Sequence, residues 1–203
     1  EAIGMPLTLG LTDGGCTDEG HYIPAHSIVM ADLLLDVTSI TQVMSDGADP
    51  LSINIMDVFL PTQSSDAIMA GQVANYFLDE MIRDTSKPFA RLFTESFKIY
   101  PIEFVRMTDD QIRGMNTKMK AHYANILKVI EERFPALGID RRLCIIEPSY
   151  FSPQYGIKGR LDVYYEHEEA QSASIIELKS SRPFKPNSYG LRSANYNQTL
   201  LYD

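Results

Sequence analysis

Three charged side chains near the end of the chain have types and spacing suited to chemistry on phosphate esters. Glu177 and Lys179 stand two residues apart in an apolar segment, and Asp162 follows a loop that contains two glycines. Alternate residues of a strand point to one face, so Glu177 and Lys179 share a face while Ile176 and Leu178 share the other. A carboxylate and an ammonium group beside buried apolar residues are costly unless they are paired or used.

Three short strands are expected to position these side chains. The pattern predicts strands over 143–146, 160–166 and 173–179, with a polar turn over 167–172. If the second and third strands form a hairpin through that turn, Asp162 reaches the face that carries Glu177. Two carboxylates placed together repel each other, and a divalent cation between them removes the repulsion.

This arrangement predicts hydrolysis of phosphodiesters with Mg²⁺ or Mn²⁺. Magnesium prefers oxygen ligands and retains several waters, and Asp162, Glu177 and the main-chain carbonyl of Leu178 could supply the protein oxygens. Glu147, after the first strand, is a candidate further ligand. A metal-bound water is a stronger nucleophile, and Lys179 would orient it or stabilise the developing negative charge.

Each of these features alone has a simpler interpretation. A Glu-x-Lys triplet in a strand usually forms a solvated ion pair, and an Asp after a glycine-rich loop usually belongs to a turn. The two motifs together are more specific than either one alone. Gly156-x-x-Gly159-x-x-Asp162 comes first, and the predicted hairpin separates it from Glu177-x-Lys179. We expect the two glycines to let a nucleic acid strand approach the main chain closely.

The first two thirds of the chain predict helices that would wall such a site. One helix begins at Asp66 and ends before Pro88, with an apolar stripe at every fourth residue from Met69. A second begins at Thr108, which has capping-box spacing to Gln111, and ends at Pro135 and Gly138. The remaining expectations are an irregular, partly strand-like entry over 1–27, a strand or helix start over 28–35, a turn over 46–50 and a helix over 191–202.

Composition and charge limit which kinds of partner this chain can bind. The chain has 203 residues, a net charge of −9 and 22% charged residues, typical of a folded domain. It contains no run of 18 apolar residues, so we expect no membrane partner. Residues 1–140 carry 10 basic and 20 acidic side chains, whereas residues 141–203 carry 8 and 7. Only the last third could therefore face a polyanion. Two cysteines, Cys16 and Cys144, favour a cytoplasmic location, and we expect each to be a buried free thiol.

The segment 143–203 resembles the PD-(D/E)XK nuclease superfamily, in particular its RecB-like branch and the bacterial relatives of replication helicase-nucleases. The resemblance rests on GIKGRLDVYYE, IIELKSS and NQTLLYD. It implies that Asp162 and Glu177 bind metal, that Lys179 is catalytic and that Glu147 is a further acid. Gln198 and Tyr202 match the branch's Q-x-x-x-Y motif, which implies contact with DNA. The implied fold is α/β (α+β), a restriction-endonuclease-like small mixed sheet flanked by helices, with a helical N-terminal extension.

The resemblance also implies partners and cofactors. The expected substrate is single-stranded or flap DNA in replication or repair, and a helicase domain is expected in the same full-length chain, with a cytoplasmic, nucleoid-associated location. No iron–sulfur cluster is expected within these 203 residues, since only Cys16 matches the first cluster ligand of relatives. Two positions depart from the pattern: Asn75 and Asn195 stand where the branch usually has His.

The sequence also suggests a domain division and a basic surface near the site. We divide the chain into a mainly helical part, 1–140, and a catalytic core, 141–203, within one continuous domain of a longer protein. A discontinuous basic set near the site is either a solvated surface or a track for phosphates, and it includes Lys158, Arg160 and Arg182. The alternative function is a nuclease-fold DNA-binding or scaffolding module with weakened catalysis, which the departures at Asn75 and Asn195 favour.

Overall fold

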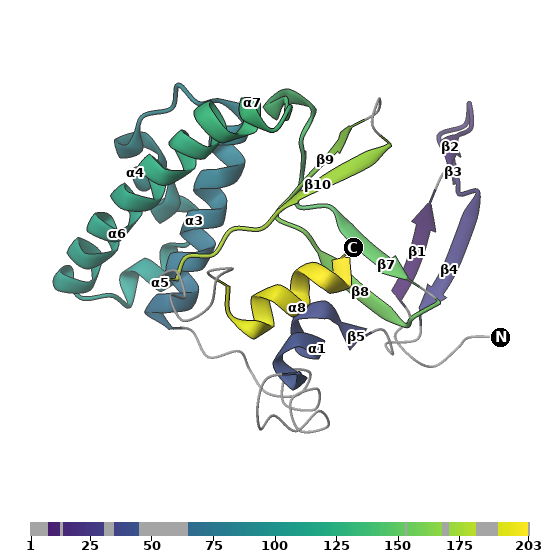
Figure 1. Cartoon of the computed structure of the whole chain (residues 1–203), viewed down its shortest axis with the longest axis horizontal. Helices are drawn as coiled ribbons and strands as arrows, with labels where there is room; N and C mark the ends of the chain where they lie inside the picture. Colours follow the sequence, from purple (N-terminus) through teal and green to yellow (C-terminus); the bar gives the residue numbers. More distant parts are fainter. Residues whose placement is uncertain are drawn as a thin grey trace. The chain divides into compact units, whose positions relative to one another are not determined.

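The computed structural model of this chain describes residues 8–12, 14–30, 35–44, 65–152, 154–167, 171–181 and 191–202. It is a mixed α/β structure, as expected, and within the described residues it has helices and four small sheets of two or three strands (Figure 1). The chain divides into two compact units. Unit 1 comprises Glu1–Asn54, Tyr150–Gly159 and Ser193–Asp203, and unit 2 comprises Ile55–Ser149 and Arg160–Arg192. These units cut across the linear division at residue 140, because unit 2 combines the helices with the proposed catalytic strands.

Unit 1 contains most of the strands and two helices. Its antiparallel pairs are β1 (Thr8–Thr12) with β4 (His26–Met30) and β2 (Gly15–Cys16) with β3 (Tyr22–Ile23). A third sheet has the order β5-β8-β7, formed by Leu35–Asp36, Ile157–Arg160 and Ser149–Ser152, and β5 runs parallel to β8. The last residue of β8 and the first residue of β7 belong to unit 2. The strand-like character expected for the N-terminal segment is confirmed within the described residues.

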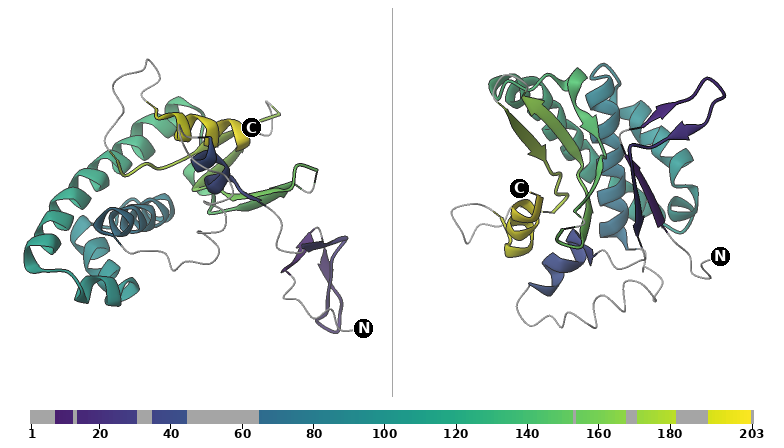
Figure 2. Two further views of the ribbon diagram at one scale, coloured as in Figure 1. Left: turned by 90° about the horizontal axis from the view of Figure 1, so that it is seen from below. Right: turned by 90° about the vertical axis from the view of Figure 1, so that its right-hand side faces the viewer.

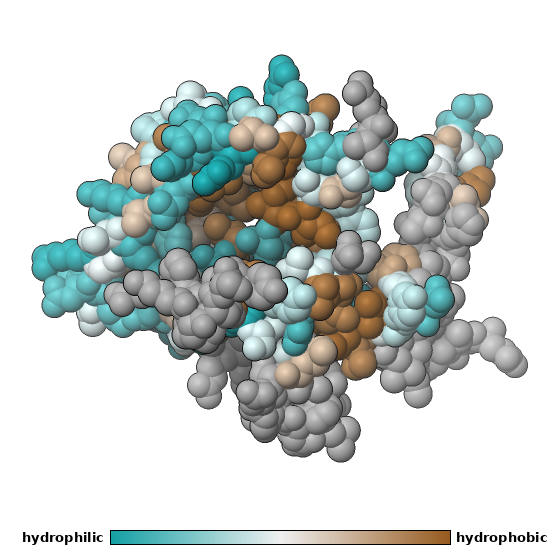
Figure 3. Space-filling model, viewed as in Figure 1, coloured by the Kyte–Doolittle hydropathy of each residue, from teal (hydrophilic) through white to brown (hydrophobic). Residues whose placement is uncertain are grey.

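The helices of unit 1 are α1 (Val37–Val43) and α8 (Ser193–Tyr202), which pack against each other. Asp36 caps α1, because its side chain accepts a hydrogen bond of 2.8 Å from the main-chain nitrogen of Thr38. The helix predicted over 191–202 is confirmed as α8. In Figure 3, apolar side chains are exposed around β5 and the end of α8, where Leu35 and Leu200 lie at the surface.

Unit 2 is built around α3 (Asp66–Arg83), the first long helix that the sequence predicts. Ser65 caps it, since its hydroxyl accepts a hydrogen bond of 3.2 Å from the nitrogen of Ile68. The expected stripe is confirmed, because Met69, Val73, Phe77 and Met81 are all buried. Figure 2 shows this helix beside α6, with which it makes the main helix–helix contact of the unit.

The second predicted helix is α6 (Asp109–Lys128), and its start is confirmed in detail. The Thr108 hydroxyl accepts from the Gln111 nitrogen at 3.3 Å, while the Thr108 nitrogen donates to the Gln111 side chain at 2.8 Å. The helix continues into a π-helical turn, η1 (Val129–Arg133), and a last turn, α7 (Phe134–Ala136). Pro135 has no N–H to donate, and Gly138, at φ 71°, closes the end.

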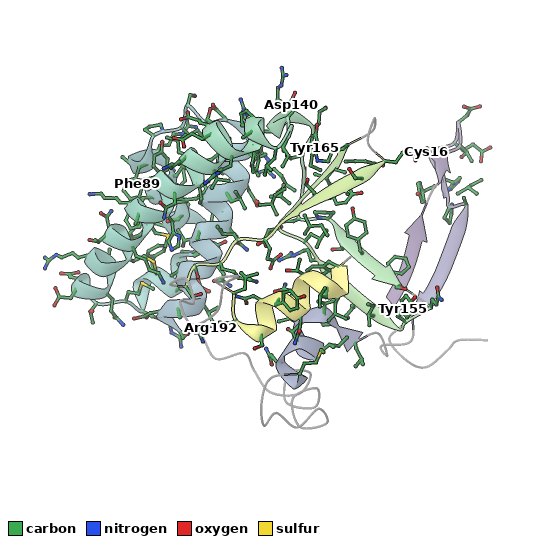
Figure 4. The ribbon with its side chains drawn as sticks, viewed as in Figure 1. Cys16, Phe89, Asp140, Tyr155, Tyr165 and Arg192 are labelled. Atoms are coloured by element: carbon green, nitrogen blue, oxygen red, sulfur yellow. The ribbon has the colours of Figure 1, made fainter. Side chains whose placement is uncertain are left out.

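Two helices between α3 and α6 were not assigned from the sequence. They are α4 (Phe89–Ile99) and α5 (Pro101–Val105). Their aromatic residues join α3 and α6 in one cluster, in which the Phe77 ring meets Phe89 and Tyr123 edge-on, at centroid distances of 6.0 and 6.5 Å. Figure 4 labels Phe89 within this helical layer. The outward side of the layer is largely hydrophilic in Figure 3, and no described helix has both the length and the apolar character to cross a bilayer.

The sheet of unit 2 has the order β10-β9-β6 and is antiparallel throughout. The predicted hairpin is confirmed as β9 (Val163–His167) and β10 (Ser172–Ile176), but the three predicted strands are shorter than expected. Segment 143–146 begins as a 3₁₀ turn, η2 (Arg141–Leu143), and only β6 (Ile145–Ile146) is extended. The strand predicted over 160–166 is interrupted at Asp162, and the strand predicted over 173–179 ends at Ile176.

Some expectations fall on other parts of the chain. The segment 28–35 is extended where described, as β4 and β5. The turn expected over 46–50 lies outside the described residues. Cys16 and Cys144 are free thiols, as expected, but the expectation that both are buried is wrong, because Cys16 is exposed and Cys144 is only partly buried. Burial raises the pKa of Cys144 to about 11.

Candidate active site

Asp162 and Glu177 face each other just past the end of the β9–β10 ladder. The last aligned pair is Val163 with Ile176, so the next residues outward are Asp162 and Glu177. Residues directly opposite in an antiparallel pair project to the same face. Val163 is fully buried and Ile176 packs on the core. Since neighbouring residues project to opposite faces, the carboxylates of Asp162 and Glu177 lie on the face away from the core. The structure therefore brings together the two acids that the sequence singled out.

Two hydrogen bonds fix the Asp162 carboxylate. Its Oδ1 accepts from the side-chain amide of Asn75 on α3 at 3.2 Å, and its Oδ2 accepts from the main-chain nitrogen of Leu178 at 2.6 Å. The main-chain oxygen of Asp162 accepts from the nitrogen of Glu147 at 2.9 Å. The carboxylate is thus held from the helix and from the segment that follows β10, and its orientation is preorganised.

Lys179 pairs with Glu177, as the strand period predicts. The Lys179 Nζ lies 2.8 Å from Glu177 Oε1, with 34% and 21% of the two side chains exposed. Leu178, between them, packs toward the hydrophobic core. The alternation of Glu177 and Lys179 on one face with Ile176 and Leu178 on the other is confirmed.

Burial and the neighbouring acid oppose ionisation of Asp162. Desolvation is the larger cause and the charge of Glu177 the second, and together they raise the pKa of Asp162 to about 6. The hydrogen bond from Leu178 and the charge of Lys179 act in the opposite direction. A carboxylate in this condition gains from a cation, because a positive charge relieves both the repulsion and part of the desolvation.

Asp79 is a further acid at this site that the sequence analysis missed. It lies on α3, one turn after Asn75, and its pKa is raised to about 7 by burial and then by the charge of Glu147, with a smaller contribution from Asp162. Spacing was the available signal, since residues four apart share a helix face and Asn75 had been noted. The apolar stripe that the sequence analysis used to predict α3 lies on other positions of the helix.

Glu147 lies between β6 and β7 with a positive φ of 52°. A non-glycine residue rarely adopts this region, and the bond from its nitrogen to Asp162 helps to hold it there. Its Oε1 lies 3.6 Å from the Arg160 guanidinium. The carboxylate of Glu147 is therefore part of the electrostatic surroundings of the site and is also paired with a cation, which fits a secondary role.

Sequence analysis also missed His122, on α6. The imidazole is half-buried near the main chain of Ser180, the residue directly after Lys179. Burial is the main cause that lowers its pKa, and Lys118 lowers it further. No sequence signal points to this proximity, because the fold alone brings together residues 58 positions apart.

The other predicted site residues lie in unit 1 or outside the described chain. Gln198 and Tyr202 are on α8, where the Gln198 amide donates to the Tyr202 hydroxyl at 3.3 Å. Lys158 is exposed on β8, and Arg182 lies outside the described residues. Asn195 is half-buried on α8, where its main-chain oxygen accepts from Thr199.

The two glycines before Asp162 serve packing and a turn. A Cβ on Gly159 would lie 2.6 Å from the Tyr202 ring and 3.2 Å from Val37, so the absent side chain makes room for Tyr202. Gly156 has φ 66°, a conformation that favours glycine in a turn. The expectation that Gly159 leaves its main chain open to nucleic acid is therefore wrong, because the Tyr202 ring occupies that side.

The donor set fits a hydrated magnesium or manganese ion held by few protein ligands. Within the described ranges, no three His, Cys, Asp or Glu side chains are grouped closely enough to hold an ion. Asp162 and Glu177 supply carboxylate oxygens, and Mg²⁺ commonly binds through one or two carboxylates while it retains waters. The raised pKa of Asp162 is consistent with a pair of acids that a cation would stabilise.

Comparisons with models of known protein families, with curated protein sequences and with solved structures found no significant match to this chain.

Proposed function

We propose that this chain is a metal-dependent DNA nuclease domain that hydrolyses phosphodiester bonds, with single-stranded or flap DNA as its substrate. The observation that carries the proposal is the placement of Asp162 opposite Glu177 at the end of the β9–β10 ladder, with Lys179 paired to Glu177. Sequence resemblance supports a restriction-endonuclease-like fold and a place beside a helicase domain in a cytoplasmic replication or repair protein.

In this proposal, Asp162 and Glu177 hold a Mg²⁺ or Mn²⁺ ion, and the Leu178 carbonyl is a third oxygen donor. When bound, the ion supplies charge neutralisation at the phosphate and a water of lowered pKa. Asn75 and the Leu178 nitrogen orient Asp162 for this task. Glu147 and Asp79 add negative charge around the ion without being its main ligands.

Lys179 acts on the phosphate and the attacking water. Its ammonium group lies against Glu177, so it can shift between this carboxylate and a phosphate oxygen that enters the site. The water oxygen forms a bond to phosphorus, one phosphorus–oxygen ester bond breaks, and the leaving sugar oxygen takes up a proton. Lys179 stabilises the negative charge that develops on the phosphate oxygens during this step.

A second candidate function is a nuclease-fold module that binds or organises DNA with weakened catalysis. The observation that favours it is the amide of Asn75, which donates to Asp162 and so satisfies an oxygen that a metal would otherwise take. The pairing of Glu177 with Lys179 favours the catalytic reading.

Degradation of end-labelled single-stranded DNA tests the choice. Wild type should degrade it with Mn²⁺ and lose activity with EDTA, whereas E177Q should lose at least a hundredfold. The matched control is E166Q, because Glu166 is an exposed acid on β9, and it should retain wild-type activity. If wild type and E177Q are equally inert but bind DNA alike, the binding module is supported and the nuclease is rejected.

A further inference from the structure

A serine and a histidine meet across the β9–β10 hairpin, at the end of the ladder away from the candidate active site. The Nε2 atom of His167 on β9 lies 2.9 Å from the Oγ atom of Ser174 on β10, and both side chains are partly buried. The ladder pairs Ser174 with Tyr165 and Ser172 with His167, so the hydrogen bond runs diagonally between the strands. The main-chain positions of both partners are therefore set by the ladder.

The ring of Tyr165 packs against the imidazole of His167. The two rings meet edge-on, with their centroids 4.7 Å apart and their planes at 79°. Tyr165 is buried, and Figure 4 labels it on β9. This neighbour limits rotation of the imidazole, so Nε2 faces Ser174 in a defined orientation. A hydroxyl within hydrogen-bond reach of a base, with a third group that orients the base, is the arrangement of serine nucleophiles in acyl transfer.

We infer that Ser174 is an activated nucleophile toward carboxylic esters, with His167 as its general base. In this role the Ser174 hydroxyl donates to a neutral Nε2 atom. Oγ forms a bond to the acyl carbon, its proton passes to Nε2, and the ester carbon–oxygen bond breaks with the electron pair on the leaving oxygen. Water then attacks the acyl carbon, the bond from Oγ to carbon breaks, Oγ regains a proton, and the carboxylic acid is released.

The main chain of β10 can stabilise the charge that develops on the ester oxygen. Within the described residues, β10 is an edge strand of the sheet β10-β9-β6. Alternate N–H groups of an edge strand point away from the neighbouring strand, and such a group can donate to the carbonyl oxygen. The partial burial of Ser174 and the adjacent Tyr165 ring favour a small ester with a short acyl group.

Acetylation by p-nitrophenyl acetate tests this pair in the metal-free full chain. Peptide mass spectrometry measures the acetylation rate of each serine, and release of p-nitrophenolate measures turnover. The internal reference is Ser86, an exposed serine whose hydroxyl donates to the Asp84 carboxylate at 2.7 Å. We expect Ser174 to be acetylated at least about tenfold faster than Ser86, although it is less exposed, because an imidazole is the stronger base.

Two variants separate the base from the hydrogen bond. H167Q keeps an acceptor for the Ser174 hydroxyl but has no basic nitrogen, so it should slow acetylation of Ser174 by roughly tenfold or more. S174A should lose the fast release of p-nitrophenolate, and Ser86 should react as in wild type in both variants. If H167Q does not fold, as judged by circular dichroism, H167N takes its place.

A wild-type Ser174 rate no greater than that of Ser86 would overturn the inference, and so would an unchanged rate in a folded His167 variant. Either result would leave the serine and the histidine as a structural bond between strands. The reaction uses neither DNA nor a metal ion, so its outcome is independent of the proposed nuclease function.

Discussion

The helix α3 borders two regions of unit 2 that use burial for opposite purposes. Its core-facing side carries Met69, Val73, Phe77 and Met81 into an apolar and aromatic layer where every contact favours the folded state. Other positions on the same helix carry Asn75 and Asp79 to the carboxylates beside the β9–β10 hairpin. Full burial of apolar side chains stabilises the first region, whereas even partial burial penalises charge in the second.

The comparison of the two regions shows that the buried acids lower the stability of the folded chain. Asp79 and Asp162 have pKa values raised to about 7 and about 6, so near neutral pH the folded state opposes charges that the unfolded chain accepts freely. A structure selected only for stability would replace such acids with amides. Acids with raised pKa values beside a Lys–Glu pair are the feature on which the proposed function rests.

Removal of an aromatic ring from the core should have the largest effect. Phe77 is completely buried between rings of α4 and α6, so F77A should lower the free energy of unfolding by about 3–5 kcal/mol. Urea titration followed by circular dichroism measures it. The control V105A removes an apolar residue that is 85% exposed, and it should change stability by less than about 0.5 kcal/mol. A small effect of F77A would mean that the aromatic layer is not the core.

Replacement of an acid in the polar region should act in the opposite direction. The pKa of Asp79 in the folded chain, about 7, lies above the ordinary value of 3.8 for this side chain. Its stabilising contribution is therefore complete below about pH 4 and is lost as the pH rises through 7. D79N removes the charge and should stabilise the chain by roughly 1–3 kcal/mol at pH 8, with a smaller gain at pH 5.

Urea titrations of D79N at the two pH values measure this difference. The control is E131Q at an exposed acid on η1, which should change stability by less than about 0.5 kcal/mol at both. A loss of stability in D79N at pH 8 would contradict the account, since it would show that the Asp79 charge is favourably paired in the fold.

The smallest effect is expected where the helical layer meets solvent. T108A removes one half of the capping box of α6 and should lower stability by about 1 kcal/mol, because the Gln111 nitrogen loses its acceptor. T108S keeps the acceptor and is the matched control. Thermal unfolding of both variants measures the difference, and equal melting temperatures would show that the hydroxyl contributes nothing to the helix start.

Local patterns explain why the apolar region was predictable. The four-residue period from Met69 and the capping box at Thr108 are written in neighbouring residues, and both helices formed as expected. The helix α4 was missed although its sequence carries a local signal, since Phe89, Leu92, Phe93 and Phe97 recur at helical spacing. Only its packing against Phe77 and Tyr123 could not be predicted, because those residues come from other helices.

The polar region was predictable in part. The two-residue period placed Glu177 and Lys179 together and the turn predicted the hairpin, so the pairing of Asp162 with Glu177 followed. The break in the strand at Asp162 was not visible in the sequence, where residues 160–166 alternate without interruption. His122 and Asp79 were missed because their contacts with this region are made only in the folded chain. Gly159 was misread because Tyr202, 43 positions away, packs over it.

Calorimetric titration of Mn²⁺ into the metal-free full chain tests most directly whether Asp162 and Glu177 form an ion site. The account predicts one ion per chain in wild type, affinity weakened at least tenfold in E177Q, and wild-type affinity in E166Q. An absence of binding at millimolar Mn²⁺, or equal affinity in E177Q and wild type, would contradict the account and leave the paired acids without a metal to hold.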